Sequence, residues 1–183
     1  MRSKAKRPEQ IADVIAGRRE RIAVRRDCAR LLLRILALAV AGYALFTQVF
    51  LIAQVGGMGM FPALKDGDLA IAFRMQRTYA RDDVIAYRAD GQRRIGRIVA
   101  READVVAMDG SGTLLVNGTP QAGEILYPTC AKAGVQYPCR VPEGCVFVLG
   151  DYRTQAQDSR DFGPIPLGDV EGKLITILRR RGL

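Results

Sequence analysis

Few side chains in this sequence have the chemistry of a nucleophile or a general base. The chain has no histidine, and its only serines are Ser3, Ser111 and Ser159. Beyond the basic N-terminal segment, its lysines are Lys65, Lys132 and Lys173. Peptide hydrolysis by a hydroxyl and an amine requires the two groups within about 3 Å of each other, with the amine neutral. Because Ser3 precedes the long apolar segment and Ser111 falls in a predicted turn, the supply of hydroxyl nucleophiles is small.

Three patches of sequence nevertheless occur in an order that is typical of one enzyme family. They are GMGMFPAL at 57–64, RIGRIVAREADVV at 94–106, and GDYR at 150–153 followed by DSRDFGPI at 158–165. Together they resemble the type I signal peptidases, and RDDVI at 81–85 is similar to a Gly-Asp-Val-Val strand of that family. Each motif alone is weakly specific, but the ordered set is highly specific. The resemblance covers residues 35–178.

The resemblance implies that the catalytic positions are vacated. The nucleophilic serine of the family corresponds to Gly59, and its general-base lysine corresponds to Gly96. Gly57 stands where family members often have a hydroxyl donor, and Ala156 replaces a serine that orients the lysine in some members. Losing one member of such a pair typically costs about as much as losing all of it, on the order of a million-fold. We therefore predict that no catalytic group is intact.

Two further sets of residues receive non-catalytic interpretations. We predict that Asp151, Asp158 and Arg160 form charge-assisted pairs that hold a turn. The apolar residues Met58, Met60, Phe61 and Pro62 have two readings. They line an extended-peptide groove in a loop that dips into the bilayer surface, or they are ordinary core. We predict the groove, because the loop directly follows the apolar segment.

The N-terminal third has the pattern of a membrane anchor. Residues 1–34 contain eleven basic and four acidic side chains, which leaves only +2 of the net charge of +9 for the rest of the chain. Residues 35–55 carry no charge, and about 21 helical residues cross a hydrocarbon core of about 30 Å. A buried core helix and a cleavable signal peptide are alternatives, but the first would show a polar stripe and the second a shorter apolar run.

The position of the basic residues predicts the orientation and excludes one class of partner. Basic flanks stay on the cytoplasmic side, so residues 1–34 are predicted to be cytoplasmic, 35–55 to be a transmembrane helix and 56–183 to be extracytoplasmic. The same basic segment can lie on anionic lipid, and no nucleic-acid partner is expected.

From Gly56 onward the pattern predicts a mostly β domain, and the resemblance implies the coiled antiparallel sheet of signal peptidase I. Short apolar or alternating runs are separated by Gly, Pro and Asp. The expected strands are 69–73, 84–87, 94–100, 105–108, 114–116, 146–149 and 174–178. Asn117-Gly118 predicts a hairpin turn, within a meander over residues 94–119. Residues 122–144, with three prolines, are expected to form a loop.

The cysteines predict neither a metal site nor a cofactor. Cys28 is predicted to be cytoplasmic, whereas Cys130, Cys139 and Cys145 are predicted to lie outside, where disulfides form. Cys130 and Cys139 could bridge the proline-rich loop, which would leave Cys145 unpaired. Their spacing matches no familiar zinc site.

Three functions remain open at this point. The first is a membrane-anchored homologue that binds exported precursors without cleaving them; similar proteins with vacated catalytic positions assist pilin assembly in Gram-positive pilus clusters, so a pilin is one implied partner. The second is an active serine endopeptidase that uses relocated residues, such as Lys65 and Ser159, or a partner. The third is a structural membrane protein without a peptide groove.

Overall fold

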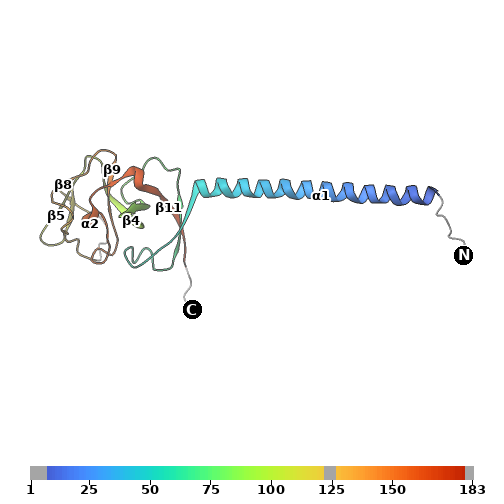
Figure 1. The fold of residues 1–183 in the computed structure, drawn as a ribbon. Coiled ribbons are helices and arrows are strands. Elements are labelled where there is room, and N and C mark those ends of the chain that lie inside the picture. The colour runs from blue at the N-terminus through green and yellow to red at the C-terminus, as the bar shows by residue number, and fades with distance from the viewer. Residues whose placement is uncertain (1–7, 122–126, 180–183) are drawn as a thin grey trace. The chain divides into compact units, whose positions relative to one another are not determined.

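The computed structural model describes residues 8–121 and 127–179 and divides the chain into two units, residues 1–47 and 48–183. The first unit is occupied by helix α1, which runs from Pro8 to Val49 (Figure 1). Within α1, residues Arg25–Val49 are long and apolar enough to cross a membrane, and Leu38 is 73% exposed in the isolated chain. A helix that exposes apolar side chains so fully requires an apolar environment.

The predicted helical span of residues 35–55 is wrong at its C-terminal end. The helix stops at Val49, and Phe50–Gln54 form strand β1, which pairs antiparallel with β2 (Leu69–Phe73). Leu51 and Ala53 are buried while Ile52 and Gln54 are exposed, the alternation of a strand with one face on a core. Because β1 is as apolar as the end of α1, no change in hydropathy marks the boundary between them. Only the pairing of β1 with β2 shows where the strand begins.

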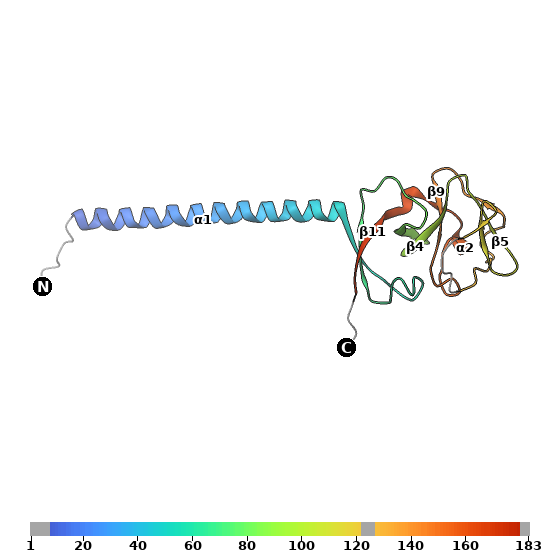
Figure 2. The same cartoon turned by 180° about the vertical axis from the view of Figure 1, so that it is seen from behind.

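The second unit is a mostly antiparallel β domain, as expected (Figures 1 and 2). Its larger sheet has the order β1-β2-β11-β3-β4-β9-β10. The strands not yet given bounds are β3 (Val84–Ala89), β4 (Gln92–Arg101), β9 (Cys145–Leu149), β10 (Ile165–Pro166) and β11 (Val170–Leu178). A short helix, α2 (Ser159–Phe162), and a 3-10 turn, Leu167–Asp169, lie between β9 and β11 in sequence.

The smaller sheet has the order β7-β6-β5-β8. Its strands are β5 (Val105–Met108), β6 (Leu114–Val116), β7 (Thr119–Pro120) and β8 (Cys139–Arg140). Asn117 and Gly118 both have positive φ, as a two-residue hairpin turn requires. The expected meander is confirmed only from β5 to β7, because β4 pairs with β9 in the other sheet.

Buried apolar residues lie on both sheets and in the space between them. One cluster joins the smaller sheet to β4 and β9 and includes Val106, Leu114 and Phe147. A second, with Ile85, Tyr87 and Val148, lies on the larger sheet. A third contains Val55, Met60, Leu64 and Ala70. In both views of Figures 1 and 2, β4 and β9 lie between β5 and β11, so β4 is held at the centre of the domain.

Candidate functional site

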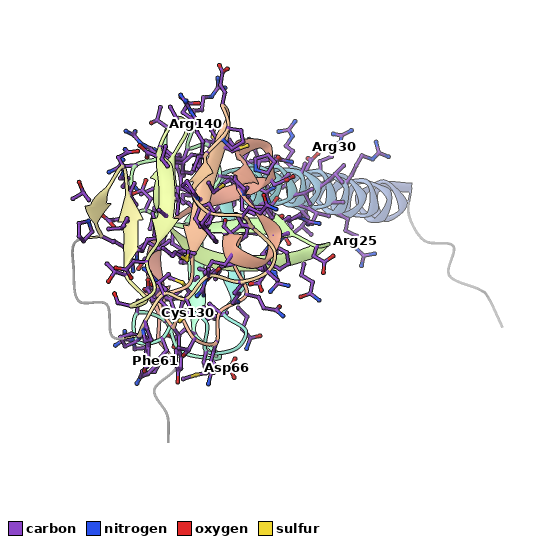
Figure 3. The ribbon with its side chains drawn as sticks, turned by 90° about the vertical axis from the view of Figure 1, so that its left-hand side faces the viewer. Arg25, Arg30, Phe61, Asp66, Cys130 and Arg140 are labelled. Carbon is purple, nitrogen blue, oxygen red and sulfur yellow. The ribbon has the colours of Figure 1, made fainter. Side chains whose placement is uncertain are left out.

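The segment that carries Gly59 is a compact loop between β1 and β2. The Val55 N–H donates to the Asp68 carbonyl at 2.8 Å, and the Gly57 N–H donates to the Asp66 side chain at 2.7 Å. Met60 and Leu64, 2% and 1% exposed, anchor the middle of the loop in the core. Figure 3 shows Phe61 and Asp66 at the edge of the β domain. The loop therefore holds Gly59 in place through its buried neighbours.

Gly59 lies against the segment that follows β9. Its carbonyl accepts a hydrogen bond from the Tyr152 N–H at 3.0 Å, and a Cβ placed at Gly59 would lie 3.7 Å from the Cα and Cβ of Ala156. The resemblance aligns Gly59 with the nucleophilic serine and Ala156 with a serine that orients the lysine in some members, and the two residues are neighbours. The 3.7 Å spacing is ordinary van der Waals contact, so a Cβ fits at Gly59.

Gly96 is far more crowded. It pairs with Ile85 across β3 and β4, and a Cβ placed there would lie 2.5 Å from Val148 Cγ1. The same Cβ would lie 3.3 Å from both Tyr87 Cε1 and the Leu149 carbonyl oxygen. Valine is stiff at χ1, and Tyr87 and Val148 are both fully buried, so neither can move aside without disturbing the core. The space that any side chain at Gly96 would need is therefore already filled by the core.

A cleft of about 560 Å³ opens beside Gly59. Its floor includes Ala53 to Met60, and its walls include Gln92 to Ile95 and Gln155 to Gln157. Because β1 is the edge strand of the larger sheet, Ala53 and Gln54 place a sheet edge along the cleft. An extended peptide can pair with such an edge.

The polar residues that remain near the site are bonded to one another. Asp158 and Arg160, each 1% exposed, form an ion pair at 2.8 Å. The Asp158 carboxylate also caps α2 and accepts the Gly150 N–H at 3.1 Å. Asp151 does not join this pair; it receives both Nε and Nη2 of Arg97, at 2.8 and 2.7 Å. The hydrogen bonds that Arg97 donates to Asp151 raise the pKa of Arg97, although burial opposes this.

Comparison with known proteins identifies the family of the chain. Residues 28–178 match the family model described as signal peptidase, peptidase S26. The chain belongs to this signal peptidase family. The predicted resemblance is thereby confirmed, and with it the expectation of a β domain carrying one N-terminal apolar helix. Signal peptidase I proteins are membrane-anchored, which agrees with the apolar helix α1.

Several peptidases are similar to this family member. A probable thylakoidal processing peptidase 2 of Arabidopsis thaliana is 35% identical over 67% of this chain, but the match spans only 36% of its own length. Signal peptidase I of Bacillus caldolyticus is 30% identical over 66% of this chain and 74% of its own. A crystal structure of a signal peptidase I from Enterococcus faecalis V583 is 28% identical, covering 54% of this chain and 98% of that one, with a TM-score of 0.47.

Neither serine in the described part of this signal peptidase homologue has the surroundings of a nucleophile. Ser159 is fully buried, and its Oγ accepts the Val148 N–H at 2.9 Å. Ser111 is exposed in a turn, where it donates to Asp109 at 2.7 Å. Both hydroxyls therefore serve local structure.

Two of the three lysines outside the N-terminal segment are bound by carboxylates. Lys132 Nζ donates to the Ala156 carbonyl at 2.6 Å and to Asp161 Oδ2 at 2.7 Å. Burial opposes ionisation of Asp161, but the hydrogen bonds from Lys132 and the Asp158 backbone lower its pKa overall. Lys173 pairs with Asp83 at 2.7 Å, and Lys65 is exposed. None of them pairs with a serine.

The four predicted groove residues do not share one environment. Met58 is 40% exposed and Pro62 is exposed, whereas Phe61 is half-buried and Met60 is core. Met60 is therefore an ordinary core residue, the alternative interpretation, because the loop turns this side chain inward against Val55 and Leu64.

An aromatic stack beside the site was missed from sequence. The Phe61 ring lies 6.2 Å from that of Tyr152, which stacks on Tyr127 at 4.2 Å. The available signal was Tyr152 itself, which stands where the family motif Gly-Asp-Asn-Arg has asparagine. The stack adds apolar surface on the side of Gly59 that carries Tyr152.

The cysteines remain separate thiols in the structure. Cys28 and Cys130 are exposed, while Cys139 and Cys145 pack on the core cluster that contains Phe147. The possible bridge between Cys130 and Cys139 is therefore not formed. Burial raises the pKa of the Cys139 thiol. Within residues 8–121 and 127–179, no group of three His, Cys, Asp or Glu side chains is placed to hold a metal ion.

Proposed function

We propose that this protein is a membrane-anchored signal peptidase homologue that binds exported precursor proteins without cleaving them. The observation that carries the proposal is Gly96, because the space next to it is occupied by Val148 and Tyr87. Restoring a lysine there would require the core to move. Gly59 lacks the hydroxyl as well, so neither half of the reaction has its group.

Binding needs less than catalysis, and what it needs is present. The cleft of about 560 Å³ lies along the edge strand β1. Met58 and Pro62 give its surroundings exposed apolar surface. Main-chain pairing with a sheet edge supplies affinity, and side-chain pockets supply selectivity.

The proposed topology places the β domain outside the cytoplasm. The eleven basic residues within residues 1–34 precede the apolar part of α1, and such residues remain on the cytoplasmic side. The proposed partners are therefore exported precursors at the extracytoplasmic surface of the membrane, with a pilin subunit as the specific candidate.

The test presents the full-length protein in liposomes with two precursors, a secreted protein with its signal peptide and a pilin precursor. Cleavage is followed by mass spectrometry and binding by co-flotation with the liposomes. We expect co-flotation of at least one precursor and no cleavage. Signal peptidase I of Bacillus caldolyticus, reconstituted in parallel, shows that the secreted precursor is cleavable. Specific cleavage by this protein would overturn the proposal, and binding of neither precursor would leave a structural membrane protein. Preference for the pilin precursor would support the specific partner.

A further inference from the structure

The polar wall of the cleft carries positive charge that the cleft itself does not balance. The residues that line it include Arg93 and Arg94 but no aspartate or glutamate. Its remaining polar side chains are glutamines, which are uncharged: Gln54, Gln92, Gln155 and Gln157. A cleft lined by charge of one sign attracts a ligand of the other sign.

The two arginines differ in what neutralises them. Arg93 is bound by the Glu171 carboxylate through Nε and Nη2, the second at 3.1 Å. Arg94 forms no ion pair with any carboxylate in the described part of the chain. The unbalanced charge of the cleft is therefore that of Arg94.

Arg94 also has an unused hydrogen-bond donor. Its Nη2 donates to Gln92 Oε1 at 3.2 Å, and its Cζ lies 4.8 Å from the centroid of the Phe162 ring. Its Nε is buried and has no acceptor. Stacking on a ring fixes the plane of the guanidinium but leaves the N–H groups in that plane unsatisfied. A charged group whose protein partners are a neutral amide and a ring is incompletely compensated, so a carboxylate that reaches the guanidinium would bind favourably.

Arg94 lines the same cleft as Gly59, the position that the resemblance aligns with the nucleophile. Arg94 and Gly96 lie on the same face of β4, because side chains alternate along a strand. Arg94 is paired with Tyr87, whose ring also lies next to Gly96. A guanidinium offers only hydrogen-bond donors and no acceptor, so Arg94 cannot act as the missing base. Its planar fork is well suited to bind a carboxylate.

We propose that the cleft binds a peptide through a carboxylate seated on Arg94, either an aspartate or glutamate side chain or the C-terminal carboxylate. This inference rests on the proposed peptide-binding function and names the class of peptide. The carboxylate supplies the negative charge that the lining of the cleft lacks. The main chain of the same peptide runs along the β1 edge.

The test uses the full-length protein in detergent and short Ala/Ser-rich peptides labelled at the N-terminus. One peptide has a central glutamate and an amidated C-terminus, the second replaces that glutamate by glutamine, and the third is the glutamine peptide with a free C-terminal carboxylate. Binding is measured by fluorescence anisotropy at low and high salt. We expect at least one carboxylate peptide to bind about tenfold more tightly than the neutral peptide, as for one charge-assisted hydrogen bond. The peptide that shows the preference identifies the source of the carboxylate.

Three variants separate Arg94 from general electrostatics. Arg94→Gln should abolish the preference while the neutral peptide still binds, and Arg94→Lys should keep part of it. The control is Arg140→Gln, which removes the same charge from the exposed strand β8, labelled in Figure 3, outside the cleft lining. Circular dichroism melting shows that each variant is folded.

The outcomes separate this inference from the function on which it rests. Equal binding of all three peptides, or a preference that survives in Arg94→Gln, would overturn the carboxylate inference and leave peptide binding intact. Binding of none of the peptides would overturn both.

Discussion

Two neighbouring regions of the β domain are built from opposite kinds of residues. The turn from Gly150 to Phe162 keeps its charged side chains, and Asp158 and Arg160 are buried and paired at 2.8 Å. The cleft beside it has small residues at Gly59 and Ala156. A buried charge that loses its partner destabilises the fold, whereas a catalytic hydroxyl contributes little to it. The buried polar groups that stabilise the turn are therefore present, and under the proposed function the groups needed only for chemistry have been lost.

The largest predicted effect is in the turn. Arg160→Met should lower the free energy of unfolding by about 3–5 kcal/mol, because Asp158 would remain buried without its partner. Thermal and urea unfolding of the full-length protein in detergent, followed by circular dichroism, measures the loss. The matched control is Arg81→Met, whose ion pair with Asp104 is 45% exposed on the arginine side. It should cost no more than about 1 kcal/mol. Equal losses in the two variants would contradict the comparison.

The next prediction compares the two vacated positions. Gly96→Ala should destabilise the protein by about 1–3 kcal/mol, because the added Cβ overpacks the core. The nearest atom, Val148 Cγ1, would be 2.5 Å away. Gly59→Ala, with its nearest atoms at 3.7 Å, should change stability by no more than about 0.5 kcal/mol. Melting temperatures of the two variants provide the measurement.

A double variant sharpens this second test. Val148→Ala removes the atom that would collide, so its effect in the Gly96→Ala background should be smaller than in the wild type. Residues in contact show such non-additivity, whereas distant ones add. Strict additivity would show that Val148 does not fill the space at Gly96.

The sequence predicted the strands well where turn residues bound them. Strands β2, β5 and β6 occupy the predicted residues, because each is a short apolar run between Gly, Asp or Asn. The two-residue strands β8 and β10 were missed, since so short a pairing depends on its partner strand. The end of α1 was missed because β1 is equally apolar.

The site was predictable only as a set of residue types. The motifs aligned Gly59 and Ala156 with two serine positions of the family, and the structure places these two residues next to each other. The crowding at Gly96 comes from Val148 on another strand and cannot be read from local sequence. The environment of Arg94 has the same origin, because its stacking on Phe162 joins two segments far apart in the chain.

The third prediction concerns the serine that remains beside the cleft. Ser159→Ala should cost about 1–3 kcal/mol of unfolding free energy, because the buried Val148 N–H loses its acceptor. If Ser159 were instead a relocated nucleophile, the variant would lose precursor cleavage while its stability remained unchanged. Paired melting and mass-spectrometric cleavage measurements distinguish the two roles. A Thr substitution, which keeps the hydroxyl, tests whether the oxygen or the small volume is required.

The smallest predicted effect concerns the other ion pairs near the cleft and depends on pH. The hydrogen bond from Arg93, with a further one from Arg88, lowers the pKa of Glu171 from 4.5 to about 2 despite its partial burial. Because the folded-state pKa is depressed, the stabilisation is fully present above pH 4.5 and is lost as the pH falls through about 2.

Glu171→Gln should therefore reduce stability by up to about 1 kcal/mol at neutral pH, because the arginines that pair with Glu171 are exposed to solvent. The difference from the wild type should shrink between pH 4.5 and 2, the interval between the ordinary and folded pKa values of Glu171. Melting temperatures across this range measure it, and high salt should reduce it further because the arginines are solvent-exposed. A difference independent of pH would mean that Glu171 acts through packing. The residues beside the cleft would then stabilise the fold by packing, as the buried turn does, and the contrast between the two regions would be lost.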